Sequence, residues 1–158
     1  MEYQIRKAKI EDLEQIKTLL QKLAQKEHDE FDETINPDYA ITEDADKFLR
    51  HRIEDQDNSL CLVVLDNEKI IGYFAGGISA VEDYRFPGQI GEGESILIEA
   101  EYRSQGLGTK FLTMFEAWCK EKGLKRMKGI VSAANKDAIK LYKRFGFEDY
   151  DLHLEKKI

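Results

Sequence analysis

Residues 96–109 constrain the fold of this chain more than any other segment. They begin with the apolar run Ile96-Leu97-Ile98, which is typical of a buried strand, and pass through Gly106 and Gly108 into an amphipathic helix. A helix start leaves its first amide groups unpaired and carries partial positive charge, and glycines let a large anion approach the backbone. The segment therefore predicts a strand, a turn and a helix that suit a pyrophosphate, although an ordinary helix start can contain the same glycines.

Two common nucleotide-binding motifs do not fit this turn. The dinucleotide fingerprint needs a third glycine three positions after Gly108, where Phe111 stands. A P-loop needs glycine followed by lysine and then serine or threonine, and Gly108 is followed by Thr109 instead. The anion site predicted here is therefore of another kind.

The hydrophobic periodicity predicts a mixed α/β chain with α+β character. A hairpin of two apolar strands precedes the turn, and strands and helices alternate after it. Glycines at 123 and 146 mark the expected ends of two helices, and Thr42 is the expected first cap of another. Helices are predicted at about residues 13–26, from 42, at 106–122 and at 138–145; strands at 3–8, 59–65, 69–75, 94–98, 127–132 and 147–154; and loops at 27–41 and 82–91.

Length and charge set further bounds. A chain of 158 residues with 42% hydrophobic positions fits a single domain over residues 1–158, and it has no apolar run long enough to cross a bilayer. The start lacks the apolar stretch of a signal peptide, so we expect a cytoplasmic protein without membrane association. A net charge of −7 argues against nucleic-acid binding, which requires a basic face.

Cysteines and histidines give no sign of a metal or disulfide site. Cys61 and Cys119 lie in separate apolar stretches, so they are expected to be core residues and not a disulfide framework. The three histidines, at positions 28, 51 and 153, have no metal-ligand spacing. We therefore expect no metal.

Two motifs together resemble the GNAT superfamily of N-acetyltransferases. The first follows the apolar strand and reads Arg103-x-x-Gly106-x-Gly108. The second lies at the distance usual in that family and reads Asn135-x-x-Ala138-x-x-Leu141-Tyr142-x-x-x-Gly146-Phe147. The opening of the chain, residues 5–13, is also similar to a GNAT start. The resemblance implies a central, mostly antiparallel twisted sheet of about six to seven strands, four flanking helices and a splayed cofactor cleft.

The resemblance also implies acetyl-CoA as the acyl donor. Its pyrophosphate would lie on the amides of residues 105–109, and its pantetheine arm would run beside the apolar strand and Asn135. The sequence departs from the family pattern at Ala100, where proline is common, and at Gln105, where lysine or arginine is common. The implied donor-binding residues are Ile96, Leu97, Ile98, Arg103, Ser104, Gln105, Gly106, Leu107, Gly108, Thr109, Asn135 and Tyr142.

Acetyl transfer to an amine requires a base for the ammonium and an acid for the departing thiolate. Tyr142 matches the tyrosine that commonly supplies the acid in this family, although a packed aromatic residue would show the same pattern. Glu94 and Glu92 precede the cofactor strand and alternate, so they are the candidate bases, with Glu99 a weaker third. Solvent-facing strand residues are the alternative interpretation of these glutamates.

An acidic run suggests the acceptor. Glu27, Asp29, Glu30, Asp32 and Glu33 fall in a predicted loop that would border the acceptor entrance in the GNAT family. We therefore expect a small cationic amine as acceptor, while a protein N-terminus or lysine stays open, as does a regulatory module that binds acyl-CoA without turnover. A homodimer is an expectation taken from the family.

Overall fold

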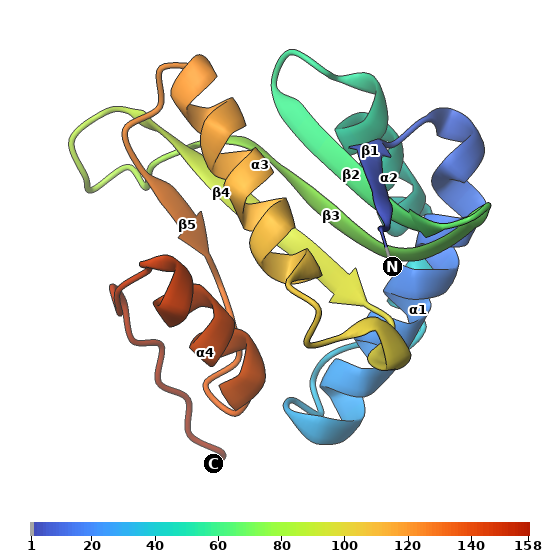
Figure 1. The fold of residues 1–158 in the computed structure, drawn as a ribbon. Coiled ribbons are helices and arrows are strands. Elements are labelled where there is room, and N and C mark those ends of the chain that lie inside the picture. Colours follow the sequence, from blue (N-terminus) through green and yellow to red (C-terminus); the bar gives the residue numbers. More distant parts are fainter. Residues whose placement is uncertain (1) are drawn as a thin grey trace.

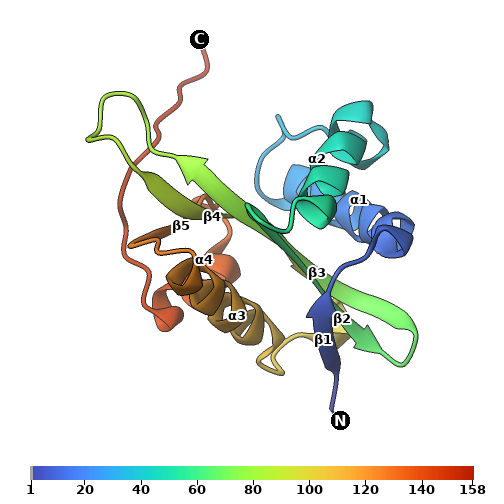
Figure 2. The same cartoon turned by 90° about the horizontal axis from the view of Figure 1, so that it is seen from above.

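A five-stranded sheet with helices on both faces organises residues 2–158, which the computed structural model describes (Figures 1 and 2). Helices α1 and α2 cover one face, and α3 and α4 lie on the other. The helices are α1 (Leu13–Glu30), α2 (Glu43–Glu54), α3 (Leu107–Glu121) and α4 (Lys136–Phe145). The strands are β1 (Gln4–Lys7), β2 (Ser59–Asp66), β3 (Lys69–Ala80), β4 (Gln89–Ile98) and β5 (Met127–Gly129).

The strands lie in the sheet in the order of the sequence. Strands β1 to β4 are antiparallel to their neighbours, and β2 and β3 form the predicted hairpin. Strand β5 pairs in parallel with β4 over only three residue pairs, of which the last joins Gly93 to Gly129. The remainder of β4, from Glu94 to Ile98, keeps β3 as its neighbour on the other side.

A bulge interrupts the pairing of β3 with β4. Gly76 lies opposite Gly93 and Ala75 lies opposite Ser95, so Glu94 is an extra residue on β4. The extra residue breaks the strict alternation of side chains, and both Glu94 and Ser95 point to the face that α1 and α2 cover, where they contact Arg52 and Tyr73. The bulge thus places two consecutive polar side chains on one face of the sheet.

Strand β2 is buried on both faces and separates two apolar clusters. Cys61, Val63 and Leu65 belong to the cluster under α1 and α2, whereas Leu62 and Val64 belong to the cluster under α3. A strand covered on both sides reads as a continuous apolar run, as this one does. Both cysteines of the chain are free and buried, as expected.

Helix caps follow the predictions from local sequence. The Thr42 side chain accepts a hydrogen bond of 3.2 Å from the Ala45 amide at the start of α2. Gly123 and Gly146 take left-handed backbone conformations after α3 and α4, with φ of 75° and 116°. None of the helices within residues 2–158 combines the length and the apolar character needed to cross a membrane.

The fold class is as predicted, but several boundaries differ. Helix α1 continues to Glu30, four residues beyond its predicted end, and β4 begins at Gln89 instead of Glu94. Strand β5 stops at Gly129 instead of Ser132, and no strand follows α4 in the described chain. The sheet therefore has five strands where six to seven were expected.

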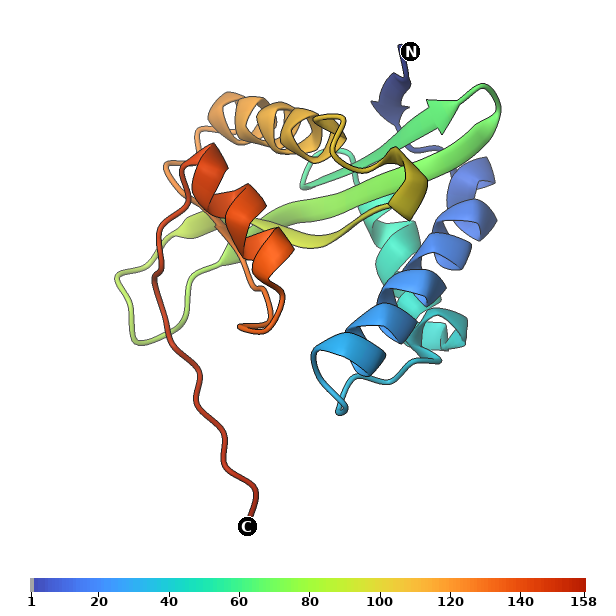
Figure 3. The ribbon, with the colours of Figure 1, turned by 60° about the horizontal axis from the view of Figure 1, so that its bottom comes forward.

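Residues 147–154 alternate as a strand would, but they lie beside no strand edge (Figure 3). Side chains hold this tail instead. Arg85, in the connection between β3 and β4, donates hydrogen bonds to the Tyr150 hydroxyl at 3.0 Å and to Asp151 at 2.9 Å. Alternation alone therefore gave the wrong element here, because a strand also requires a partner for its backbone groups.

Glu99 ties α1 to the end of the sheet. Its side chain is 6% exposed, and its two carboxylate oxygens accept hydrogen bonds from Lys22 at 2.5 Å and from Lys69 at 2.8 Å. These bonds, the one from Lys22 first, lower the pKa of the carboxyl below its ordinary value. Glu99 is thus a structural anion, which argues against the role of base that was its weaker assignment.

We predict that Glu99→Gln lowers the free energy of unfolding at pH 7 by about 1.5–3 kcal/mol, the range for hydrogen bonds to charged groups. A lowered pKa in the folded state stabilises the protein above the ordinary glutamate pKa of about 4.3, and this contribution is lost as the pH falls through the folded-state pKa. Urea titrations at pH 7 and pH 3 should therefore show a gap between variant and parent that closes at the lower pH. Glu101→Gln, on an exposed neighbour, is the control, and an equal loss in both variants would contradict the assignment.

Candidate active site

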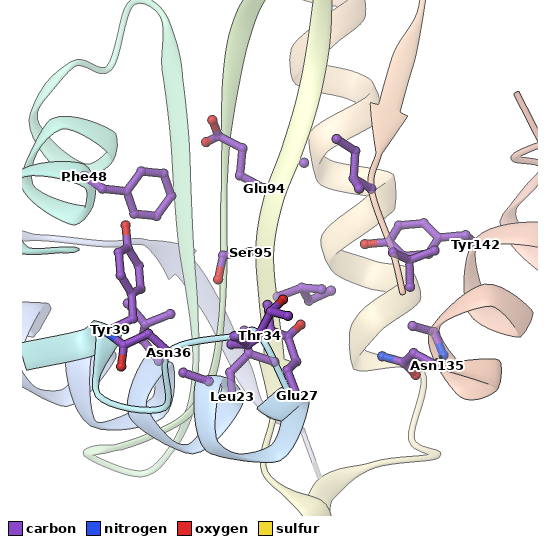
Figure 4. Close-up of a pocket in the computed structure, with 18 residues that line it drawn as sticks. Leu23, Glu27, Thr34, Asn36, Tyr39, Phe48, Glu94, Ser95, Asn135 and Tyr142 are labelled. Carbon is purple, nitrogen blue, oxygen red and sulfur yellow. Dashed lines mark hydrogen bonds between the residues drawn. The ribbon is translucent and has the colours of Figure 1, made fainter. Parts of the chain in front are cut away.

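A cavity of about 540 Å³ opens beside β4, where β5 has diverged from it. One wall comes from α1, α2 and the segment between them, and the opposite wall comes from the residues after β5 and from α4 (Figure 4). Strand β4 contributes Gly93, Glu94, Ser95 and Ile96. The lining is mostly apolar, with a few polar side chains entering from both walls.

Tyr142 enters the cavity from α4, with its hydroxyl pointing inward (Figure 4). Its ring packs edge to face on Phe147, with 5.2 Å between ring centroids, and also lies against Gly129. Among the described residues, the hydroxyl has no hydrogen-bond partner. Burial raises the pKa of Tyr142, and the charge of Glu27 raises it further. The phenol therefore keeps its proton at neutral pH and is free to donate it.

Glu27 enters the cavity from the opposite wall (Figure 4). It lies within α1, which corrects the prediction of a loop from residue 27; Asp29 and Glu30 also belong to this helix. Burial raises the pKa of the Glu27 carboxyl, the Lys26 charge opposes this rise, and the Asp32 charge adds to it. Within residues 2–158 no side chain forms an ion pair or a hydrogen bond with the Glu27 carboxylate.

The two predicted bases have different surroundings. Glu94 lines the cavity, but its carboxylate turns toward α2 (Figure 4). There, Arg52 donates hydrogen bonds of 2.6 and 2.7 Å to both carboxylate oxygens. Glu92 is not among the lining residues, and its carboxylate lies 3.6 Å from the Lys128 ammonium on β5. The structure therefore brings Glu94, but not Glu92, into the cavity with Tyr142.

The predicted pyrophosphate turn has its amides available. Lys110 makes the first backbone bond of α3, to the Gly106 carbonyl, and no side chain of the described residues caps this helix. In contrast, Thr42 and Asn135 cap α2 and α4. Gly106 has a φ of 77°, a left-handed conformation that favours glycine. A side chain at this position would point into open space, so the backbone of the turn is accessible from solvent.

Gly108 has a second role in packing. A Cβ at this position would lie 3.0 Å from a methyl group of Leu141, so its absence lets α4 approach α3. Ser104, Gln105 and Thr109 are exposed around the turn, whereas the Leu107 side chain is buried. Arg103, also exposed, donates a 2.9 Å hydrogen bond to the Ile98 carbonyl and so fixes the chain where it leaves β4.

The remaining predicted donor residues fall into two groups. Ile96 and Asn135 line the cavity, and the Asn135 side chain also accepts a 3.1 Å hydrogen bond from the Ala138 amide as the cap of α4. Leu97 packs in the cluster under α1 and α2, and Ile98 packs against the cluster under α3. Neither of these two side chains lines the cavity.

Glu27 was predicted only as part of an acidic loop, and Tyr39 and Phe48 were not predicted as site residues, yet all three line the cavity. A signal for Glu27 was present, because it follows Leu20, Leu23 and Ala24 at helical spacing and so continues the apolar stripe of α1. A carboxylate on the buried stripe of a helix is unusual and indicates a special environment. Tyr39 and Phe48 had no such signal, since their placement depends on how α2 folds back on α1.

Comparison with known proteins identifies the family. The family model described as the acetyltransferase (GNAT) family matches residues 18–147. An uncharacterized N-acetyltransferase of Methanocaldococcus jannaschii is 29% identical over 89 residues, which are 54% of this chain and 38% of that relative, so the match spans well under half of its length.

Two solved structures share the fold. A predicted acetyltransferase from Clostridium acetobutylicum, determined with acetyl-CoA, superposes with a TM-score of 0.76 at 20% identity over 99% of this chain and 96% of that one. AAC(6')-Iy, in complex with the bisubstrate analogue CoA-S-monomethyl-acetylneamine, gives a TM-score of 0.77 at 17% identity over 100% and 99% of the two chains. At these identities the likeness concerns the fold, and it agrees with the match over residues 18–147. This chain belongs to the acetyltransferase (GNAT) family, a family of acyltransferases.

Proposed function

We propose that this protein transfers the acetyl group of acetyl-CoA to a small cationic amine by direct attack in a ternary complex. The observation that carries the proposal is the continuity of the site. The uncapped start of α3, the open edge of β4 and the inward-pointing hydroxyl of Tyr142 follow one another along one side of the sheet. The two complexes named above, with acetyl-CoA and with a CoA bisubstrate analogue, support acetyl-CoA as the donor.

The donor would be held mainly by backbone. Amides of residues 105–109 suit the pyrophosphate because they lie at the positive end of a helix and have no partner among the described residues. The β4 edge beyond Gly93 has no strand neighbour within the described chain, so its backbone groups suit the amides of a pantetheine arm. The acetyl group would then reach the cavity near Ile96 and Tyr142.

Chemistry at the thioester needs two proton transfers. The acceptor ammonium loses a proton, and its nitrogen attacks the thioester carbonyl carbon. The C–N bond forms, the C–S bond breaks, and the thiolate takes a proton from the Tyr142 hydroxyl. The acylated nitrogen still carries two protons, and it gives one of them to the Tyr142 phenolate as the neutral amide forms. A phenol that burial keeps protonated suits this role.

A small acceptor fits the cavity better than a peptide does. The segment between α1 and α2 bounds the wall opposite Tyr142 with Thr34, Asn36 and Tyr39, and the cavity of about 540 Å³ has the volume usual for a small-molecule site. A protein N-terminus or lysine side chain would need an open groove for the flanking backbone. Cytoplasmic location stays a prediction from the sequence, and a homodimer stays an expectation taken from the family.

The donor site can be tested with a charge at the start of α3. Thr109→Glu adds a carboxylate at the third residue of the helix, where it favours the helix dipole but repels a phosphate. We expect acetyl-CoA affinity to fall about tenfold or more, since a hydrogen bond to a charged group is worth about 1.5–3 kcal/mol, while thermal stability holds. Thr113→Glu, one turn along the same exposed face, is the control. Calorimetric titration with equal affinity in both variants would refute the site.

The role of Tyr142 can be tested by removing its hydroxyl. Tyr142→Phe keeps the ring packing and leaves no protein group unpaired, so stability and acetyl-CoA affinity should hold while kcat falls about 10²- to 10⁴-fold. A general acid acts only while protonated, so activity of the parent is lost as the pH rises through the Tyr142 pKa. Because burial raises that pKa, the alkaline limb should lie above the ordinary value of about 10.

Tyr73→Phe is a matched control, because it also removes a buried hydroxyl, one that bonds Ser95 at 2.5 Å. This variant should lose thermal stability and keep a near-normal kcat. Single-turnover measurements will separate chemistry from product release. Parental single-turnover rates in Tyr142→Phe would remove Tyr142 from the mechanism and leave protonation to water.

A further inference from the structure

The cavity lining contains one carboxylate without a cationic partner, and the rest of it is neutral or already neutralised. Among the described lining residues, the acidic side chains are Glu27 and Glu94, and none is basic. Arg52 already neutralises Glu94 through a two-point contact, and its guanidinium is also held by the Ser59 hydroxyl at 3.0 Å. An incoming cation would have to compete with this fixed guanidinium for Glu94. Glu27 has no such partner and is the one lining carboxylate ready to receive a cation.

The wall around Glu27 is mainly apolar, and its other polar side chains, Thr34 and Asn36, carry no charge. Leu20, Leu23 and Ala24 precede it on α1, and Tyr39 and Phe48 lie farther along the same wall (Figure 4). Apolar and aromatic surface binds the carbon body of a ligand, while a second ammonium placed there would lose its hydration without gaining a second free carboxylate. A polycationic acceptor is therefore poorly matched to this lining, whereas one ammonium on an apolar body satisfies it.

We infer that the acceptor is a primary monoamine with an apolar, preferably aromatic, body, whose ammonium is bound by Glu27, and that Glu27 is the catalytic residue that takes its proton. The inference rests on the proposed acetyl transfer. Glu27 and Tyr142 enter the cavity from opposite walls, so one is placed to accept a proton and the other to donate one (Figure 4). The Glu27 carboxylate takes one proton from the ammonium and later releases it to solvent. The neutral nitrogen lone pair forms the C–N bond, and the electron pair of the C–S bond leaves on sulfur, which Tyr142 protonates.

The test compares two amines and two variants. The amines are 2-phenylethylamine, a monocation with an aromatic body, and neamine, a polycation. Glu27→Gln keeps the shape of the side chain and leaves no partner unpaired, so the variant should fold as the parent does. Glu30→Gln, on an exposed position at the end of the same helix, is the matched control. Free CoA release with mass spectrometry of the products gives kcat and KM, and calorimetry gives acetyl-CoA affinity.

We expect the parent to prefer 2-phenylethylamine over neamine by about tenfold or more in kcat/KM. Glu27→Gln should lower kcat/KM for 2-phenylethylamine about 100-fold or more, the lower end for loss of a general base. Glu30→Gln should stay within about twofold of the parent, since surface substitutions away from such a feature have small effects. Acetyl-CoA affinity should be unchanged in both variants, because neither residue touches the proposed donor site.

Three outcomes would overturn the inference. Preference for neamine would refute the monoamine class, and parental turnover of 2-phenylethylamine by Glu27→Gln would refute the role of that carboxylate, especially if Glu94→Gln abolished turnover instead. Both results leave the proposed acetyl transfer intact, because acetylated amine is still formed. Failure of the parent to acetylate either amine, with acetyl-CoA bound, would overturn the inference and count against the proposed function as well.

Discussion

The site depends on the point at which β5 stops pairing with β4. Three residue pairs hold the two strands together, and glycines on β4 allow this contact to lie close under α3: a Cβ on Gly91 would lie 2.3 Å from the Cys119 sulfur. Beyond Gly93 the strands separate while β3 continues to support β4 from its other edge. The result is a strand edge inside the molecule whose backbone N–H and C=O groups are not paired with another strand of the described chain. Both the cavity and the path proposed for the donor follow from this separation.

Three glutamates show how environment assigns different roles to one residue type. Glu99 is buried between two ammonium groups and holds α1 to the sheet. Glu94, placed on the α1 and α2 face by the bulge, is bound by Arg52. Glu27 has no cationic partner among the described residues and is held above its ordinary pKa by burial. Distance in sequence from the two motifs does not distinguish the roles of these glutamates, whereas the presence or absence of a cationic partner does.

Local chemistry made much of the fold predictable from sequence. Thr42 caps α2, Gly123 and Gly146 follow α3 and α4, and the hairpin of β2 and β3 forms because each feature depends on neighbouring residues. The start of β4 was missed because residues 89–93, which include two glycines, gain their strand geometry from pairing with β3.

The candidate site was harder to predict because most of its contacts join residues that are far apart in the sequence. Tyr142 and Asn135 lie in a recognisable motif and both line the cavity. Glu27 was assigned to a loop because the acidic run after it obscured the last turn of α1. Pairing of Glu94 with Arg52 joins β4 to α2 across 42 positions of sequence, and no local pattern reports such a contact.

The wall formed by residues 34–39 belongs to neither apolar cluster along most of its length, apart from Tyr39. It is held in place by carbonyl contacts instead: Gln21 donates to the Pro37 carbonyl at 2.5 Å, and the His28 ring lies 2.8 Å from the Ile35 carbonyl. Because these contacts use the backbone of the wall, the Ile35 side chain is free to change without loss of a hydrogen bond, whereas the side chains of Thr34 and Asn36 bond to Asp32 and to the Asp38 amide. Substitutions at Ile35 can therefore reshape this side of the cavity while the cores and the start of α3 stay as they are.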